Sequence, residues 1–178
     1  LANAAPLIMT GLSVGFAFKT GLFNIGAAGQ YTLGAFGGLI FAILLHAPWY
    51  VCLLMATVFG AVWGALPGIF KAYLNVNEVI TSIMFNWIGL YLVNELIYQN
   101  GTGPMYDVRN TRTLNLSKNA DFAQSLIPDF GLNKLFQTNS TTIAIFLAAA
   151  VAVLIWVVLN KTTFGYELKA VGLNKNAA

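Results

Sequence analysis

Charged side chains are scarce in this sequence. Only 8% of its 178 residues are Asp, Glu, Lys or Arg, 58% are hydrophobic, and no charge occurs between Lys19 and Lys71. An ordinary soluble domain has about 25% charged residues. A helix that crosses a bilayer needs about 20 apolar residues, so the uncharged stretch alone has room for two spans and a tight turn. The composition therefore excludes a water-soluble globule and predicts an all-α integral membrane protein.

Cysteine and histidine are almost absent. The sequence contains one of each, Cys52 and His46. A single cysteine excludes an internal disulfide, and the two side chains are too few to form a zinc or iron-sulfur site. The sequence also offers no Ser/His/Asp set and no thiol-imidazole pair within reach of each other, since His46 lies in a turn. We therefore expect no metal site, no catalytic residues and no cofactor bound by this chain.

Long apolar runs predict a polytopic helical bundle with about five spans. These runs cover residues of about 2–23, 30–45, 49–70, 79–98 and 143–159. The region of about 99–142 is polar and contains Gly and Pro, so we expect a loop outside the membrane, interrupted by short helices. Residues of about 160–178 form a polar tail. The chain begins without a signal peptide and ends without a closing feature, so we interpret it as a segment of a longer protein.

The lysines set the orientation of the predicted spans. Five alternating spans place Lys19, Lys71 and the three lysines of the tail on one face of the membrane. The four basic residues of the long loop lie on the other face. Positive charge in short connections favours the cytoplasmic side. The tail is therefore predicted to be cytoplasmic and the loop of 99–142 extracytoplasmic.

Glycines recur at four-residue spacing in three of the predicted spans. The pairs and triplet are Gly11 and Gly15, Gly34 and Gly38, and Gly60, Gly64 and Gly68. On a helix this spacing aligns small residues on one face, where another backbone can approach closely. The pattern favours close helix packing within one bundle over a dedicated dimer motif.

A glycine-rich stretch from Gly21 to Gln30 indicates a break between the first two spans. The stretch lacks the spacing of a phosphate-binding loop. Asn24 and Gln30 could bond the backbone groups that such a break frees. Breaks at membrane depth are tolerated where they are buried in protein or line a watery cavity. Both a break that lines a pathway and a simple interfacial turn remain consistent with the residues.

Polar residues form a stripe on the fourth predicted span. Glu78, Ser82 and Asn86 are four residues apart, and Asn94 lies further along the same span. Polar side chains inside a bilayer are costly unless they are paired, so the stripe faces other helices or a cavity. Interhelical hydrogen bonds and contact with a polar solute both explain it. The candidate pathway residues are Asn24, Gln30, Ser82, Asn86 and Asn94.

No predicted span has Asp, Glu, Lys, Arg or His at its centre. Proton- and ion-coupled pumps use such residues as relays. If the protein moves a solute uphill, the energy is therefore expected to come from another polypeptide.

Three segments, taken together, resemble a known family. They are 15–30 (GFAFKTGLFNIGAAGQ), 71–84 (KAYLNVNEVITSIM) and 163–178 (TFGYELKAVGLNKNAA). The set is similar to bacterial ABC importer permeases for nucleosides and simple sugars, which are related to ribose and branched-chain amino acid permeases. The resemblance implies one permease domain of the type II-like fold over residues 1–178, located in the bacterial plasma (inner) membrane as a multi-pass protein.

The resemblance also implies partners and a coupling segment. The expected partners are an ABC ATPase subunit that uses the ATP, a second permease subunit and an extracytoplasmic substrate-binding lipoprotein, with no nucleic acid. The tail from about residue 160 would lead into the helix that docks the ATPase. Its candidate coupling residues are Glu167, Lys169, Gly172, Asn174, Lys175, Ala177 and Ala178.

The resemblance implies nucleosides as the solute, because the first two segments are closest to that subgroup. Simple sugars of the ribose or galactoside type are the nearest alternative. An ATP-independent channel or secondary carrier and a structural scaffold are the competing classes. A pathway of Asn, Gln, Ser, Thr and aromatic residues suits a neutral polar solute, but does not distinguish a nucleoside from a sugar.

Overall fold

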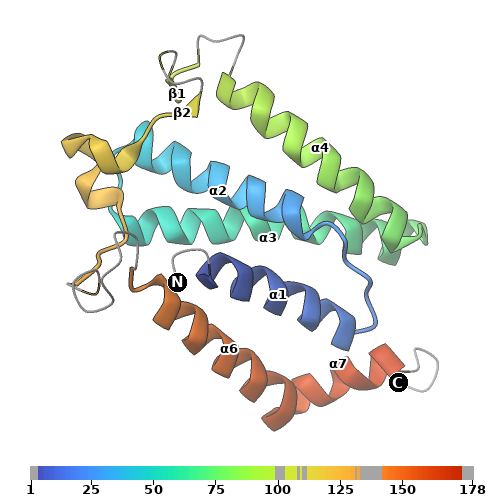
Figure 1. Ribbon diagram of the computed structural model, residues 1–178. Coiled ribbons are helices and arrows are strands. Elements are labelled where there is room, and N and C mark those ends of the chain that lie inside the picture. The colour runs from blue at the N-terminus through green and yellow to red at the C-terminus, as the bar shows by residue number, and fades with distance from the viewer. Residues whose placement is uncertain are drawn as a thin grey trace. The chain divides into compact units, whose positions relative to one another are not determined.

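A computed structural model describes residues 4–98, 103–107, 109, 112–130, 132 and 142–173 of the chain (Figure 1). The chain divides into two units. The first combines Leu1–Ile25 with Pro128–Ala178, and the second is Gly26–Ile127. A helix covers each of the five apolar runs, although its ends differ from the expected ones. The protein is a helical membrane protein.

The first unit contains α1 (Ala4–Lys19), α6 (Ala144–Lys161) and α7 (Thr163–Leu173). In Figure 1, α1 lies beside α6, and α7 follows directly after α6. Helix α1 is shorter than the predicted run of 2–23. It ends at Lys19 because Gly21 adopts a left-handed conformation with φ of 74°, which continues no right-handed helix.

The second unit is built around α2 (Ala27–Ile43), which lies against both α3 (Trp49–Leu74) and α4 (Glu78–Tyr98) (Figure 1). The contact between α2 and α3 is close. A Cβ atom added to Gly34 would lie 2.9 Å from the carbonyl oxygen of Ala56, and 3.8 Å from Cα of Gly60. The predicted role of these glycines in close packing is thus confirmed for α2 and α3. By contrast, Gly11, Gly15 and Gly68 have open space around them.

Three described helices, α3, α4 and α6, are long and apolar enough to cross a membrane. Helices α1 and α2 are apolar too, but have 16 and 17 residues, or about 24–26 Å at 1.5 Å per residue. Only 6% of the apolar window of α3, and the same share of α6, is buried inside the structure. Their apolar surfaces therefore have to be covered by lipid or by other protein.

The polar region after α4 folds over the connection between α2 and α3. It contains the antiparallel pair β1 (Tyr106–Asp107) and β2 (Arg112–Thr113), followed by the 3-10 helices η2 (Leu116–Lys118) and η3 (Ala120–Ser125). The short helices were expected. The strands were not, because two-residue strands leave no alternating pattern in a sequence.

Helix η3 is fixed to that connection by three contacts. The Ser125 hydroxyl donates a hydrogen bond to the carbonyl oxygen of Ala47 at 2.6 Å, and the Gln124 amide donates to the carbonyl oxygen of His46 at 2.5 Å. The Phe122 ring stacks on the His46 ring, with 5.2 Å between centroids. Phe122 and Met105 thereby join the hydrophobic core formed by α2 and α4.

Candidate functional site

The start of α2 is capped by a side chain from another helix. Its N-cap residue, Gly26, has no side chain to accept a hydrogen bond from the first turn. Instead, the Gly29 backbone N–H donates to Oδ1 of Asn86 on α4 at 2.6 Å. The first N–H groups of a helix lack partners within it, and the bilayer supplies no water to replace them. Asn86 therefore satisfies a backbone donor that would otherwise be costly.

Three helices converge around this cap. A Cβ atom added to Gly29 would lie 2.8 Å from Cα of Asn86, so α2 and α4 are in backbone contact there. The Trp63 indole N–H on α3 donates to the carbonyl oxygen of Phe85 at 3.1 Å. A Cβ atom added to Gly64 would lie 3.2 Å from the side-chain carbonyl carbon of Gln30. We call Gly29, Gln30, Trp63 and Asn86 the α2 start cluster.

Of the five candidate pathway residues, Gln30 and Asn86 both lie at the start of α2, Gln30 against Gly64 of α3 and Asn86 against Gly29. Ser82 lies one turn before Asn86, is 1% exposed, and donates from its hydroxyl to the carbonyl oxygen of Val79 at 3.0 Å. Asn94 is exposed and lies about 12 Å along α4 from Asn86, at 1.5 Å per residue. Asn24 belongs to the other unit, in the segment after α1.

The connection between α3 and α4 is short and held by polar contacts. Nζ of Lys71 lies 2.7 Å from Oε1 of Glu78, and the two side chains are 28% and 24% exposed. Asn75 ends α3 in a left-handed conformation with φ of 52°. Oδ1 of Asn77 accepts from the Val79 N–H at 2.9 Å and caps α4. These contacts fix the angle at which α4 leaves α3.

Helix α7 carries the candidate coupling residues that the structure describes, namely Glu167, Lys169 and Gly172. Glu167 is exposed, whereas Nζ of Lys169 donates to Oδ1 of Asn160 at 3.3 Å. Gly172 lies directly against the turn after α1. A Cβ atom added to it would be 2.8 Å from the carbonyl oxygen of Lys19 and 2.9 Å from the backbone nitrogen of Gly21.

The other candidate coupling residues lie outside the described residues. They are Asn174, Lys175, Ala177 and Ala178.

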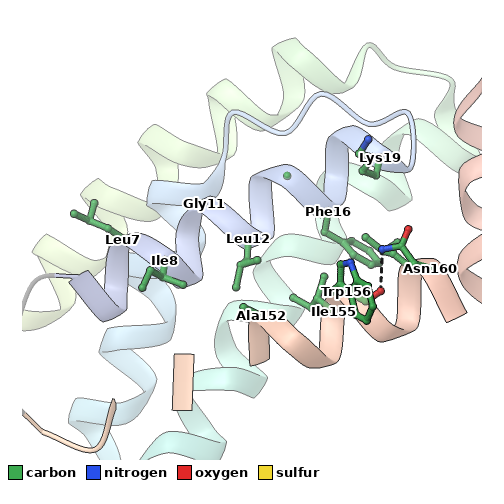
Figure 2. A pocket seen from close by; sticks show the side chains of 12 residues that line it. Leu7, Ile8, Gly11, Leu12, Phe16, Lys19, Ala152, Ile155, Trp156 and Asn160 are labelled. Atoms are coloured by element: carbon green, nitrogen blue, oxygen red, sulfur yellow. Dashed lines mark hydrogen bonds between the residues drawn. The ribbon is translucent and has the colours of Figure 1, made fainter. Parts of the chain in front are cut away.

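A groove of about 510 Å³ lies between α1 and α6 (Figure 2). Leu12, Phe16 and Ile155 are among the apolar side chains along it, and Lys19 and Asn160 stand at one end. Such a lining offers a polar solute few hydrogen-bond partners. Elsewhere in the described part of the chain, no three His, Cys, Asp or Glu side chains gather closely enough to hold a metal ion.

Sequence reasoning missed Gly29, Trp63 and Gly165 as structural determinants. Gly29 lies in the first turn of α2, where a glycine next to a predicted break was a usable signal. No such signal exists for Trp63, because the hydrogen-bond partner of its indole N–H is a backbone carbonyl oxygen on another helix. Gly165 lies so close to the end of α6 that an added Cβ atom would contact the carbonyl oxygen of Val158.

Replacing Asn86 with leucine is expected to lower the stability of the protein by about 1–3 kcal/mol, the usual cost of leaving a buried donor unpaired. The Gly29 N–H would lose its acceptor. The matched control is Asn94→Leu on the exposed side of the same helix, which should not lower stability. Thermal unfolding of the purified full-length protein in detergent measures both. Equal melting temperatures for Asn86→Leu and the unmodified protein would contradict the role of the cap.

A family model matches the whole chain, and several known proteins are similar to it. Residues 1–178 match the family model described as "Branched-chain amino acid transport system / permease component". Among similar proteins, the guanosine ABC transporter permease protein NupP of Bacillus subtilis (strain 168) is 34% identical over 188 residues, with 100% of this chain and 49% of that protein covered. The nucleoside ABC transporter permease protein NupB of Lactococcus lactis subsp. cremoris (strain MG1363) is 36% identical over 186 residues, with the same coverage of 100% and 49%.

A sugar transporter subunit is similar to a comparable degree. The glucose ABC transporter permease protein TsgB13 of Haloferax volcanii is 35% identical over 193 residues, with 100% of this chain and 47% of that protein covered. The chain thus spans about half the length of the curated relatives it matches. No solved structure matches the chain.

Proposed function

Because the chain belongs to the family of branched-chain amino acid transport system permease components, we propose that it forms part of the translocation pathway of an ATP-driven ABC importer for nucleosides. The observation that carries this proposal is the similarity of the whole chain to two permeases named for guanosine and nucleosides. The family and the apolar helices make the chain a multi-pass protein of the plasma (inner) membrane.

A simple sugar is the second candidate solute. The permease named for glucose is 35% identical to the chain, which is within one percentage point of each of the two nucleoside permeases. Overall identity therefore does not separate the two solute classes. Both are neutral and polar, and both suit a pathway with amide and hydroxyl side chains.

The proposed assembly contains three further components. An ABC ATPase subunit hydrolyses ATP, a second permease subunit completes the pathway, and an extracytoplasmic lipoprotein delivers the solute. In this proposal, the chain itself binds no cofactor and catalyses no reaction. The proposal agrees with the absence of charged residues from the span centres, since energy then comes from outside the chain.

Helix α7 would transmit the movement of the ATPase. Its Gly172 touches the backbone of the turn that follows α1, without an intervening side chain. A force on α7 would therefore reach the end of α1 through a contact that has little freedom to deform. The turn leads along the chain into the start of α2, where Asn86 holds the first turn.

Uptake in the source cells tests the proposal. Labelled guanosine, uridine, ribose and glucose are supplied to cells with and without the intact gene, and with ATP depleted at constant membrane potential. Loss of the gene is expected to abolish ATP-dependent nucleoside uptake and to leave sugar uptake unchanged. Loss of sugar uptake alone would favour the second candidate. Uptake that depends on the gene but persists without ATP would indicate a channel or carrier instead.

A further inference from the structure

The groove between α1 and α6 is apolar along most of its length and basic at one end (Figure 2). Lys19 and Asn160 stand at that end, which is the end predicted to be cytoplasmic. Gly11 and Gly15 keep the groove open, because a Cβ atom added to either would meet nothing within 4 Å. An apolar groove with a cationic end suits an amphiphilic ligand.

The groove extends over about one leaflet of a bilayer. Along α1 it runs from Leu7 to Lys19, about 18 Å at 1.5 Å per residue, and along α6 from Ala152 to Asn160, about 12 Å. The hydrocarbon core of a bilayer is about 30 Å thick, so one leaflet contributes about 15 Å. A helix that crosses the membrane would lie along the whole of α6, whereas the groove covers only its second half. The dimensions therefore fit an acyl chain better than a spanning helix.

Three lysines from three helices gather at the basic end of the groove. Lys19 is the last residue of α1 and lines the groove. Lys161 is the last residue of α6, and its Nζ lies 5.8 Å from the ring centroid of Trp156. Nζ of Lys169 on α7 donates to Oδ1 of Asn160 at 3.3 Å. Trp156 and Asn160 both line the groove, so the three ammonium groups lie close to its end.

No carboxylate balances these charges in the described part of the chain, which contains all six acidic residues. None of the three lysines has an ion pair there, whereas Lys71 on α3 pairs with Glu78. Two acidic residues belong to the same unit as the groove. Asp129 lies near the start of α6, at the end opposite the lysines. Glu167 is two residues from Lys169, and residues at that spacing do not share a helix face.

An anionic phospholipid has both features that the groove accommodates. Its acyl chain is apolar, and its phosphate carries a negative charge. Basic pockets between membrane helices on the cytoplasmic side bind anionic lipid headgroups. Trp156 lies five residues before the end of α6, at the level where tryptophan usually meets the headgroup region. A free phosphate ion would use the lysines but not the apolar groove.

We infer that an anionic phospholipid binds between α1 and α6, with an acyl chain in the groove and its phosphate among Lys19, Lys161 and Lys169. The phosphate thereby connects the ends of α1, α6 and α7. Gly172 of α7 rests on the turn after α1, so the lipid would strengthen the junction at which these helices meet. The inference goes beyond the proposed transport function and does not depend on the solute.

Native mass spectrometry of the full-length protein, purified in mild detergent, tests binding. Phosphatidylglycerol is expected to bind more tightly than phosphatidylcholine, and inorganic phosphate should not displace it. Lys19→Gln should weaken the binding of phosphatidylglycerol about fivefold, the usual contribution of one lysine near anionic lipid, and Lys19→Gln with Lys161→Gln about 25-fold. Lys118→Gln on η2 removes a charge outside the groove and should leave the affinity unchanged.

Fluorescence locates the bound lipid. Because Trp156 lines the groove, brominated phosphatidylglycerol is expected to quench the part of the fluorescence that Trp156→Phe removes. Brominated phosphatidylcholine at the same mole fraction should quench that part less. Gly11→Leu is expected to abolish this difference, because the leucine side chain would occupy the groove. Gly68→Leu on α3 is the matched control, since an atom added there also meets nothing within 4 Å.

Three results would overturn the inference. One is equal affinity of phosphatidylglycerol for the unmodified protein and for the variant that lacks both Lys19 and Lys161. Another is displacement of the lipid by inorganic phosphate, which would indicate a site for a free anion. The third is equal quenching of Trp156 by the two brominated lipids. If Gly11→Leu then also lowers the melting temperature, another protein segment fills the groove.

Discussion

Replacing Gly172 with alanine in the full-length protein is expected to reduce ATP-driven uptake about tenfold while ATP hydrolysis continues. A tenfold loss lies within the usual range of coupling between two sites, about 5–150-fold. The added Cβ atom would lie 2.8 Å from the carbonyl oxygen of Lys19 and 2.9 Å from the backbone nitrogen of Gly21. Both atoms belong to the backbone, so no side chain can rotate away. The turn after α1 and α7 would have to separate, and movement of α7 would no longer reach α1.

The measurement compares solute uptake with ATP hydrolysis in membrane vesicles. Gly68→Ala is the matched control, because an atom added there meets nothing within 4 Å. Alanine is more favourable than glycine inside a helix by about 1 kcal/mol, so the control should be neutral or stabilising. Gly21→Ala should reproduce the loss, since Gly21 has φ of 74° and faces Gly172. Unchanged uptake in Gly172→Ala would contradict the coupling role.

The apolar runs predicted where helices lie but not where they end. Residues 20–23 continue the first apolar run, yet α1 ends at Lys19. Hydropathy averages over a window and does not register a single left-handed residue such as Gly21. Helix α2 starts three residues before and ends two residues before the predicted span of 30–45, and α3 ends four residues after the predicted 70. The reason is related, because capping depends on backbone angles and partners that only the folded chain defines.

The candidate site was predictable to the level of helix faces. The spacing of Ser82 and Asn86 placed both on one side of α4, and the structure confirms that this side faces other helices. The spacing could not identify the Gly29 N–H as the partner of Asn86, because the two residues are 57 positions apart in the sequence. The contact of Gly172 with Gly21 was inaccessible for the same reason. Periodicity within one helix predicts a direction, whereas a tertiary contact requires the arrangement of two.

The exposed face of α4 shows a different limit of sequence reasoning. Asn94 was expected to be a pathway residue, and it is exposed. Trp87 and Tyr91 on the same helix are exposed too, which the sequence did not predict. Aromatic residues in a span are usually part of helix packing, and only their exposure in the folded chain distinguishes these two from buried rings such as Phe36. Exposure depends on what surrounds a helix, and a single sequence does not contain that information.

Replacing Gly165 with alanine is expected to have the largest effect on folding. Gly165 is buried in the first turn of α7, where its N–H donates to the Thr162 hydroxyl at 3.1 Å. An added Cβ atom would contact the carbonyl oxygen of Val158 and approach Cα of Leu159 to 2.6 Å. Extra atoms in a close-packed site cost about 1–3 kcal/mol. Here the neighbours are backbone atoms of the last turns of α6, so we expect the upper end of that range.

Gly165→Ala should therefore change the angle between α6 and α7, lower the melting temperature and prevent the ATPase from copurifying with the permease. Gly15→Ala on α1 is the control, because it adds an atom in open space. Thr162→Ala removes the cap of α7 together with the hydrogen bond that the Thr162 hydroxyl donates to the Val158 carbonyl oxygen, and should cost about 1–2 kcal/mol. A Gly165→Ala protein with normal stability and a bound ATPase would contradict this prediction, because the junction between α6 and α7 would then tolerate a side chain. The two glycines of α7 thus have separable predicted roles, since Gly172→Ala should keep the ATPase bound and lose only coupling.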